Sequence, residues 1–190
     1  MKEETAIVLD YLSRGYSSSY TGEAIAQAVG TTRFTLLELV PRDGVFLALR
    51  QQVYIGPEER KEVKFIKGRL DYARLTNAAR NELPLVIEET IKANEPKFVE
   101  FFNKAGPISI RKHSLELLPS VGKKHMEAIV EEREKKPFES FKDLTERVNL
   151  MPNPVRVIQE RALEELQGVS IKYYMFTAPP KREDAPRRYR

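Results

Sequence analysis

The stretch LLPSVGKKHMEAIVEER, residues 117–133, decides how the rest of this chain is interpreted. Pro119 and Gly122 mark a turn of about four residues, and the apolar residues after it recur at helical spacing. Lys123 and Lys124 begin this helix, where the aligned peptide dipoles already repel cations. Two lysines at this place are therefore either solvated or matched by a bound anion.

A turn this short between two helices predicts an anion site. It needs a residue without a Cβ at its tightest point, and we expect Gly122 to supply one. The backbone N–H groups of residues 121–124 then have no intrahelical acceptor and point outward. A helix N-terminus of this kind binds phosphate oxygens well.

The same stretch resembles the helix-hairpin-helix element of DNA-repair and RNA-processing proteins, in which an apolar pair, Pro-Gly-apolar-Gly, a polar pair and a small residue follow one another. The positions that match are Leu118, Pro119, Val121, Gly122, Lys123, Lys124, Ala128 and Ile129. Ser120 departs from the pattern, because the motif has its first glycine there. The candidate phosphate-binding residues are Ser120, Val121, Gly122, Lys123, Lys124 and His125. For His125, exposure to solvent is the alternative. A purely structural pair of helices stays open as the alternative.

A second, similar unit follows the first. Helices are expected at 109–118, 123–135, 141–148 and 154–167. Ser140 and Asp143 have the spacing of a capping box at the start of the third helix. The second turn, with Pro152 and Pro154, has no glycine and lacks two backbone N–H groups. We interpret residues 107–168 as a tandem helix-hairpin-helix domain, all-α, whose second pair serves packing.

The first 70 residues consist of short apolar segments separated by turn signals. These segments are 6–12, 23–29, 34–40, 45–49, 52–55 and 63–66. Strands this short at this spacing predict a small barrel. We interpret residues 1–70 as an OB-like β-barrel domain, so the predicted fold class is α+β in two domains.

Residues 71–106 are expected to connect the two domains through helices. Pro84 is assigned to the first turn of a helix over 85–93, and a second helix begins at Glu95, just before a proline. The phenylalanines of this second helix recur at i, i+3 and i+4, which assigns them to the core.

The charge is balanced along most of the chain. Of 32 basic and 28 acidic side chains, the excess lies in residues 169–190, with six basic against two acidic. Residues 169–178 alternate enough to form a last strand that returns to the barrel. Residues 179–190 form a basic, proline-rich tail that we expect to be disordered. Such a tail adds salt-sensitive attraction for nucleic acid rather than recognition.

Two surfaces of the N-terminal domain are further candidates for nucleic-acid contact. Arg14, Tyr16 and Tyr20 lie in a loop that binds oligonucleotides in OB-folds, and tyrosines stack on bases at about 1–3 kcal/mol each. A flexible surface loop is the alternative. The second surface is a basic stretch with Lys64, Lys67 and Arg69, which a solvated strand face explains nearly as well.

The sequence carries no catalytic signature. It contains no P-loop, GxGxxG or HExxH motif, and a chain without cysteine has no thiolate nucleophile. The two histidines have no partner at ligand spacing, so we expect neither a metal nor a cofactor. No segment has the length of a membrane span, and the N-terminus lacks the order of a signal peptide. These observations predict a noncatalytic, cytoplasmic protein.

Several segments resemble an archaeal domain-of-unknown-function family whose members are described as nucleotide- or RNA-binding proteins. They are LDYL (9–12), AQAVG (26–30), FTLLELVP (34–41), VYIG (53–56) and residues 99–124 and 131–144. The module order also resembles that of the bacterial Holliday-junction-binding subunit, whose sequence differs. The resemblance implies a protein that binds RNA or single-stranded nucleic acid, with phosphates at the first hairpin and bases on the OB-like domain. Two alternatives stay open: a DNA repair or recombination accessory that binds duplex or branched DNA, and a protein-interaction module of an RNA-processing assembly.

Overall fold

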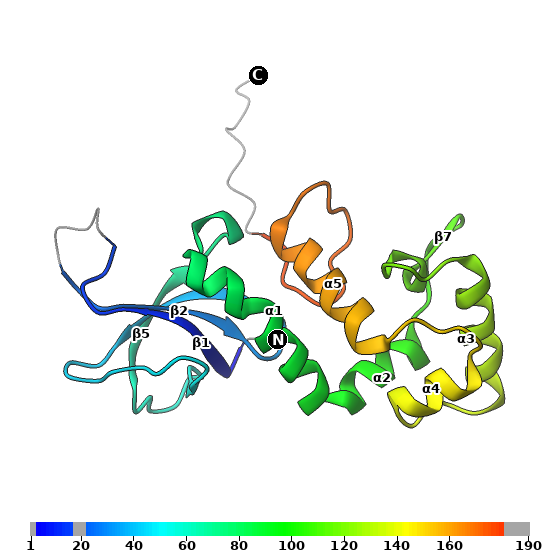
Figure 1. Ribbon diagram of the computed structural model, residues 1–190, viewed down its shortest axis with the longest axis horizontal. Helices are drawn as coiled ribbons and strands as arrows, with labels where there is room; N and C mark the ends of the chain where they lie inside the picture. Colours follow the sequence, from blue (N-terminus) through cyan, green and yellow to red (C-terminus); the bar gives the residue numbers. More distant parts are fainter. Residues whose placement is uncertain (1–2, 17–21, 181–190) are drawn as a thin grey trace, which may run out of the picture.

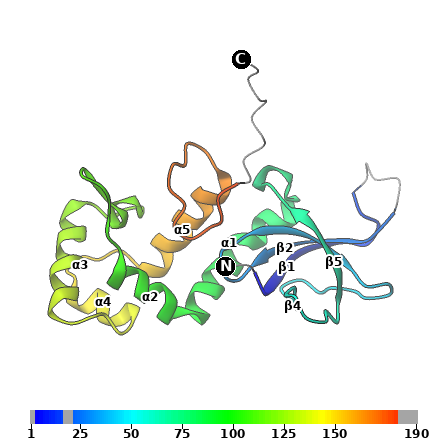
Figure 2. The same ribbon diagram turned by 180° about the vertical axis from the view of Figure 1, so that it is seen from behind.

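Five antiparallel strands form a curled sheet at one end of the molecule. A computed structural model describes residues 3–16 and 22–180 of the chain. The strands are β1 (Thr5–Leu12), β2 (Ile25–Gly30), β3 (Leu36–Pro41), β4 (Gln52–Tyr54) and β5 (Val63–Arg69). Their order is β4-β1-β2-β3-β5, so β4 and β5 lie at the two edges, and the described residues show no pairing between them (Figure 2). The predicted barrel is therefore observed as an open half-barrel.

Strands β2 and β3 are buried on both faces, which explains their almost continuous apolar sequence. One face packs against the helices through residues such as Leu9 and Leu36. The other face includes Leu39 and is covered by Leu47, which is fully buried. The prediction of a strand over 45–49 is therefore wrong, because this apolar run is a loop that covers the sheet.

Five α-helices make up most of the rest of the molecule. They are α1 (Asn77–Ala93), α2 (Glu95–Lys104), α3 (Lys123–Lys135), α4 (Phe141–Arg147) and α5 (Pro154–Gln167). Helices α1 and α5 lie between the sheet and the end formed by α2, α3 and α4, which gives the protein an elongated shape (Figure 1). The predicted helices over 123–135 and 154–167 are confirmed, and the helix over 141–148 ends one residue earlier.

Helix α1 begins earlier than the sequence predicted. It starts at Asn77, because the Thr76 side chain accepts the N–H of Ala79 at 3.0 Å and caps it. Pro84 consequently lies inside the helix rather than in its first turn. The carbonyl of Pro84 accepts a hydrogen bond of 2.8 Å from Gln159, which ties α5 to α1.

The helix predicted over 109–118 is also wrong. A two-stranded hairpin, β6 (Pro107–Ser109) and β7 (Lys112–His113), is followed by one short 3-10 helix, η2 (Ser114–Leu117). The N–H and the hydroxyl of Ser114 both donate to the carbonyl of Gly106, at 3.0 and 2.7 Å, and close the hairpin. These local bonds compete with the helix that the apolar spacing favoured.

Residues 171–178 return to the sheet end without forming a strand. The buried Glu165 carboxylate holds them by accepting the N–H groups of Met175, Phe176 and Thr177, at 2.8–3.0 Å. The N–H of Ala178 then donates to the carbonyl of Arg33 at 3.2 Å. The tail predicted to be disordered lies outside the described residues from position 181 onward.

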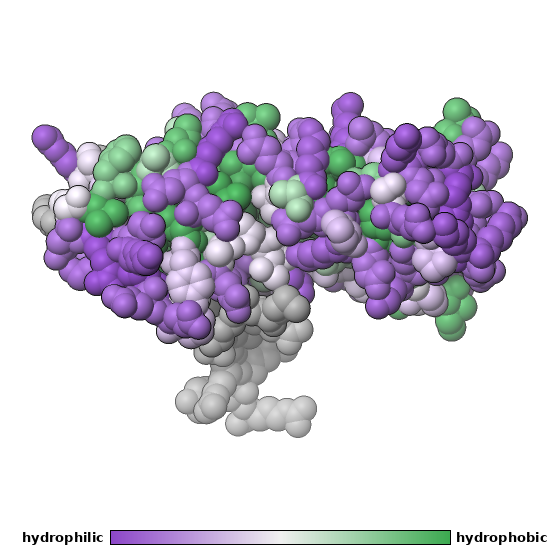
Figure 3. Space-filling view, turned by 90° about the horizontal axis from the view of Figure 1, so that it is seen from below, coloured by the Kyte–Doolittle hydropathy of each residue, from purple (hydrophilic) through white to green (hydrophobic). Residues whose placement is uncertain are grey.

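One apolar core extends from the helix-facing side of the sheet to α5. It includes Phe98 and Phe102 of α2, which confirms that the phenylalanine stripe is core. The sheet and the helices share this core, so the domain boundaries at residues 70 and 107 stay predictions. In the described ranges, no helix is long and apolar enough to cross a membrane. Seen from below, the end formed by α3 and α4 is mainly hydrophilic, whereas apolar residues gather over the sheet end (Figure 3).

Candidate nucleic-acid interface

The start of helix α3 has free backbone donors and two lysines. Gly122 is its N-cap residue and offers no side chain as a cap, and the first intrahelical bond runs from Met126 N to Gly122 O at 3.0 Å. The N–H groups of Lys123, Lys124 and His125 therefore have no intrahelical acceptor. The first turn of α3 contains no acidic residue. Donors, dipole and lysines at this place all favour an anion.

Ser120 occupies the backbone conformation that the motif assigns to glycine. Its φ is 62°, and the N–H of Val121 donates to the carbonyl of Leu118 at 3.1 Å. Pro119 at the second position and a positive φ at the third are features of a type II turn. Buried Leu118 and Val121 anchor this turn to the core. At position 120 this chain therefore has serine in place of the motif's glycine but keeps the same turn.

Gly122 does not have the role that the sequence suggested. Its φ of −90° and ψ of −177° lie in the extended region, which any residue adopts. A Cβ built at Gly122 would have no atom within 4 Å. The prediction that the turn needs glycine here is wrong, since Ser120 is the strained position. What Gly122 provides is open space beside the free N–H groups.

The two lysines are exposed and weakly paired. Lys123 Nζ lies 3.8 Å from Glu127 Oε1, and both side chains are more than half exposed. Exposed pairs of this kind contribute little. Lys124 forms no ion pair within the described part of the chain. Both ammonium groups are therefore available to an anion at the start of α3.

His125 joins this turn to the second one. Its Nε2 lies 3.0 Å from the carbonyl oxygen of Leu150, so residues 118–122 and 148–153 lie side by side. The prediction left His125 between phosphate contact and solvent, and the observed contact assigns it to holding the two turns together. Leu150 itself has a φ of 54° and an exposed side chain. Sequence reasoning missed both features, because no motif marks them.

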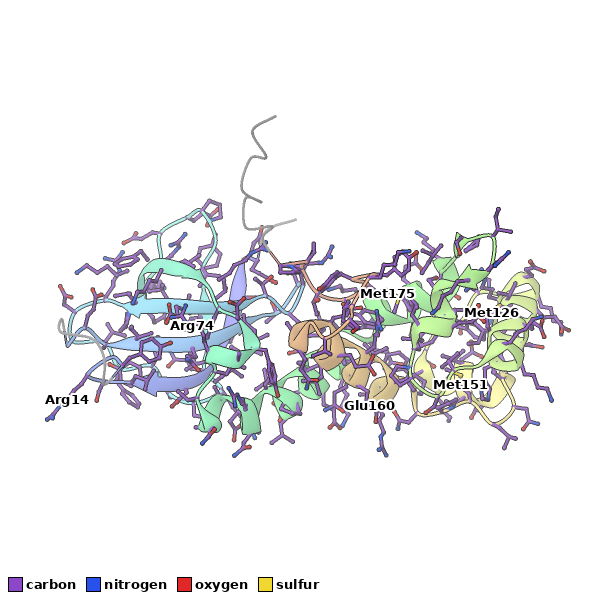
Figure 4. The ribbon with its side chains drawn as sticks, turned by 90° about the horizontal axis from the view of Figure 1, so that it is seen from above. Arg14, Arg74, Met126, Met151, Glu160 and Met175 are labelled. Carbon is purple, nitrogen blue, oxygen red and sulfur yellow. The ribbon has the colours of Figure 1, made fainter. Side chains whose placement is uncertain are left out.

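The other predicted residues lie far from this turn. Arg14, in the β1–β2 loop, and Met126, beside the turn, are at opposite ends of the molecule (Figure 4). Lys64, Lys67 and Arg69 lie on edge strand β5 of the sheet. Lys64 Nζ is 3.2 Å from Asp43, and Arg69 donates to the carbonyl of Pro179 at 3.1 Å. The predicted residues therefore form two separate groups.

Tyr16 belongs to a polar network between the sheet and η1 (Tyr72–Arg74). Gln27, fully buried on β2, donates to the Tyr16 hydroxyl at 2.9 Å and accepts the N–H of Thr76 at 2.9 Å. Burial raises the pKa of Tyr16, and the neighbouring Glu38 carboxylate adds to the rise. The tyrosine hydroxyl is thus held by the sheet rather than free. Tyr20 lies outside the described residues.

Asp10, Gln27 and Glu38 form a row across three neighbouring strands, as the register pairs each with the next. Thr76 donates its hydroxyl to Asp10 at 2.5 Å, so the row fastens the start of α1 to the sheet. Polar residues inside the apolar strands β2 and β3 were the sequence signal for this network. Within residues 3–16 and 22–180, no group of three histidine or acidic side chains is arranged to hold a metal ion.

Comparison with known proteins gives one consistent family. A family model described as "Protein of unknown function (DUF655)" matches residues 2–178. The uncharacterized protein MJ0038 of Methanocaldococcus jannaschii is 44% identical over 175 residues, which cover 92% of this chain and 79% of that protein. The crystal structure of Af1531 from Archaeoglobus fulgidus is similar at a TM-score of 0.83 and 47% identity, over 93% of this chain and 100% of that one. The chain therefore belongs to the DUF655 family, whose members include these two archaeal proteins.

Proposed function

We propose that the protein binds nucleic acid, without catalysing a reaction on it, by holding backbone phosphates at the start of α3. The observation that carries this proposal is the uncapped N-terminus of α3, with three free N–H groups beside Lys123 and Lys124. In this interpretation the chain contains a tandem helix-hairpin-helix, η2 with α3 and α4 with α5. Contacts of this kind position a protein on the phosphate backbone and do not discriminate sequence.

The energetics favour a bound phosphate over solvated lysines. Each lysine at a helix N-terminus costs a few tenths of a kcal/mol when it is exposed. A phosphate between the lysines and the N–H groups reverses the sign of that interaction, and charge-assisted hydrogen bonds contribute about 1.5–3 kcal/mol each. The open space beside Gly122 allows a phosphate oxygen to approach the backbone closely.

The curled sheet supports RNA or single-stranded nucleic acid as the ligand. Its five strands and open seam are compatible with an OB-like barrel, which is often partly open and binds single strands. In this proposal, bases stack near the β1–β2 loop, with Arg14 at its start. The loop and the α3 turn lie at opposite ends, so one strand would have to run along the length of the molecule.

Duplex or branched DNA is a second candidate, favoured by the placement of the two turns. The hydrogen bond from His125 to Leu150 holds both turns side by side. Two adjacent turns contact successive phosphates of a rigid duplex backbone more easily than those of a flexible strand. The second turn would then orient the protein on the duplex and would not bind phosphate through free N–H groups.

Binding across a salt series tests the proposal. Single-stranded RNA, single-stranded DNA, duplex DNA and a four-way junction are compared for wild type and the double variant Lys123→Ala/Lys124→Ala. We expect the double variant to bind about tenfold more weakly and its salt slope to fall by about two. Lys142→Ala is the matched control, because Lys142 is equally exposed and lies 3.7 Å from Glu146 at the same i,i+4 spacing.

The outcomes separate the candidate functions. Preference for single strands supports the first proposal, and preference for duplex or junction DNA supports the second. Equal loss in the Lys142→Ala control would mean that any surface lysine matters and that α3 has no special site. If no nucleic acid binds at any salt concentration, the protein-interaction alternative is favoured and the proposal is rejected.

A further inference from the structure

A cavity of about 720 Å³ lies at the sheet end, far from the α3 turn. It is enclosed by β3, β5, the segment that follows β4 and residues 178–179. Residues of β5 and of the segment after β4 both line the cavity, and β4 and β5 are the unpaired edges of the curled sheet. Its volume is within the roughly 300–1,000 Å³ of small-molecule sites.

Three arginines from separate segments line this cavity without a carboxylate partner. Arg33 follows β2, Arg60 follows β4 and Arg69 ends β5. Within the described ranges, none of the three has an acidic oxygen within 4 Å of its guanidinium. Each donates one hydrogen bond to a backbone carbonyl, of Thr177, Gly56 and Pro179 respectively, at 2.7–3.1 Å. Most of their N–H donors therefore stay available.

Arg33 is the most constrained of the three. Its Nε is buried and has no hydrogen-bond acceptor among the residues that the structure describes. A buried donor without a partner is costly, and a ligand oxygen would satisfy it once the Arg33 side chain turns toward the cavity. Burial lowers the pKa of the neighbouring Lys97; the Glu3 carboxylate opposes this shift, and the charge of Arg33 adds to it.

The acidic residues of the cavity wall, Glu3 and Glu4, form no ion pair with these arginines in the described ranges. Glu3 accepts the N–H groups of Thr32, Arg33 and Thr35 at 2.7–3.1 Å, so backbone donors stabilise its carboxylate. Glu4 has an exposed side chain. The guanidinium groups therefore have no fixed anion, and arginine binds phosphate in a bidentate manner better than lysine does.

We propose that this cavity binds a nucleotide, with its phosphate at the three arginines and its base and sugar on the apolar wall. That wall consists of Leu37, Ile55 and Ile66. The nucleotide is either free or the end of a single strand, since both present the same phosphate ester. This site is separate from the α3 turn and does not depend on the function proposed there.

Titration of the full-length chain tests the proposal. The probes are adenosine monophosphate, inorganic phosphate, and one short oligonucleotide with and without a 5′-phosphate, followed by calorimetry. We expect adenosine monophosphate or the 5′-phosphorylated oligonucleotide to bind, and Arg60→Gln/Arg69→Gln to weaken that binding at least about tenfold. Lys92→Gln is the control: Lys92 is an exposed residue of α1 and does not line the cavity. Thermal unfolding checks that each variant remains folded, and Arg60→Gln alone gives a milder second variant.

The outcomes also keep this site apart from the α3 turn. Binding of the mononucleotide identifies a free ligand, and binding of the 5′-phosphorylated strand alone identifies a strand end; both support the proposal. Inorganic phosphate that binds as tightly as the nucleotide would overturn it, as would unchanged binding in the folded arginine variants. Loss of nucleotide binding in Lys123→Ala/Lys124→Ala would move the signal to α3 and also overturn it. None of these results alters the salt-dependent test of the α3 turn.

Discussion

The turn at residues 118–122 and the turn at residues 148–153 lie side by side and have similar backbone conformations. The third residue of each, Ser120 and Leu150, has a positive φ, of 62° and 54°. In each turn the next residue donates its N–H to the carbonyl three residues back, at 3.1 and 3.3 Å. Each turn begins at the residue that ends the preceding helix, Leu118 after η2 and Val148 after α4. Both residues are buried in the common core.

The two turns differ in what they offer to a ligand. The first leads into α3 through Gly122, which leaves the helix N–H groups free. The second leads into α5 through Asn153, whose side chain accepts the N–H of Arg156 at 3.2 Å, and Pro154 has no N–H at all. The same backbone therefore serves packing in one case and exposes donors in the other. In the function proposed for α3, hairpin geometry alone is not sufficient for phosphate binding, and the cap residue makes the difference.

The largest expected effect tests whether the buried residues Leu118 and Val148 stabilise the two turns in the same way. Leu118→Ala removes a buried side chain before the first turn and is expected to cost about 3 kcal/mol of unfolding free energy. Val148→Ala removes fewer buried atoms and is expected to cost about 2 kcal/mol. Urea unfolding measures both. The control is Leu150→Ala. Its unfolding free energy should stay within about 0.5 kcal/mol of wild type, because this side chain is 84% exposed. A large loss of unfolding free energy in only one of these two variants would show that the two turns are not structurally equivalent.

The next effect, about 1 kcal/mol, separates capping from ligand binding. Asn153→Ala removes a side-chain cap, so we expect about 1 kcal/mol lower stability and unchanged nucleic-acid affinity. Gly122→Ala is expected to cost less than about 1 kcal/mol, because the added methyl group meets open space and alanine is only a poorer N-cap residue. That methyl group blocks the approach of a phosphate, so affinity should fall about tenfold, which corresponds to about 1.4 kcal/mol. Equal affinity losses in both variants would contradict the assignment of the site to the first turn.

Helix α3 was predictable in its bounds, whereas the turn before it was only marked, at Ser120, as a departure from the motif. Apolar spacing and the charged face from Lys123 to Lys135 specify the helix locally, so the sequence contains its limits. The positive φ at Ser120 depends on the burial of Leu118 and Val121, which fixes the chain on both sides of the turn. The shortness of the turn suggested Gly122 for the special conformation, since glycine usually adopts it, whereas the motif has its first glycine at position 120.

A smaller effect tests the strain in both turns together. Ser120→Gly and Leu150→Gly each relieve a positive φ that costs an L-residue roughly 1–2 kcal/mol. Glycine also has more freedom in the unfolded chain, so the net gain in stability should be about 0.5–1 kcal/mol in each case. Urea midpoints measure it. A control is Gly168→Ala, which should lose stability because Gly168 has a φ of 71° at the end of α5. If Ser120→Gly also weakens binding, the serine hydroxyl contacts the phosphate.

The cavity proposed to bind a nucleotide could not have been predicted from the sequence. Arg33, Arg60 and Arg69 come from three segments, and only the curl of the sheet brings them to one wall. Arg33 has no motif around it, and Arg60 and Arg69 belong to a basic stretch that a solvated strand face explained nearly as well. In contrast, the site proposed at α3 lies within six consecutive residues, 120–125, so its members could be named from the sequence. Local sites are visible in sequence, whereas sites assembled by topology are not.

The smallest expected effect concerns the residues that cap the short helices before each turn. His113 caps η2, and its Nδ1 accepts the N–H of Leu115 at 3.2 Å, which requires a neutral nitrogen. Ser140 caps α4, and its hydroxyl accepts the N–H of Asp143 at 3.0 Å at any moderate pH. Burial lowers the pKa of His113 below its ordinary 6.5, the charge of Arg133 lowers it further, and Glu116 opposes both. Only the first turn therefore has an acid-sensitive cap.

The sign follows from the proton balance. Because the folded pKa of His113 is below the unfolded one, the unfolded chain binds more protons as the pH falls below about 6.5. The stability of the first turn should therefore be complete above that pH and decline as the pH falls toward the folded pKa. Hydrogen exchange at pH 7 and pH 5 measures this as a lower protection factor for Leu115 and an unchanged one for Asp143. His113→Asn keeps an acceptor at the cap without a titrating group, so it should remove the pH dependence and isolate it from His125. Equal loosening of both caps in acid, or a His113 pKa above 6.5, would mean that the two turns do not differ in this respect.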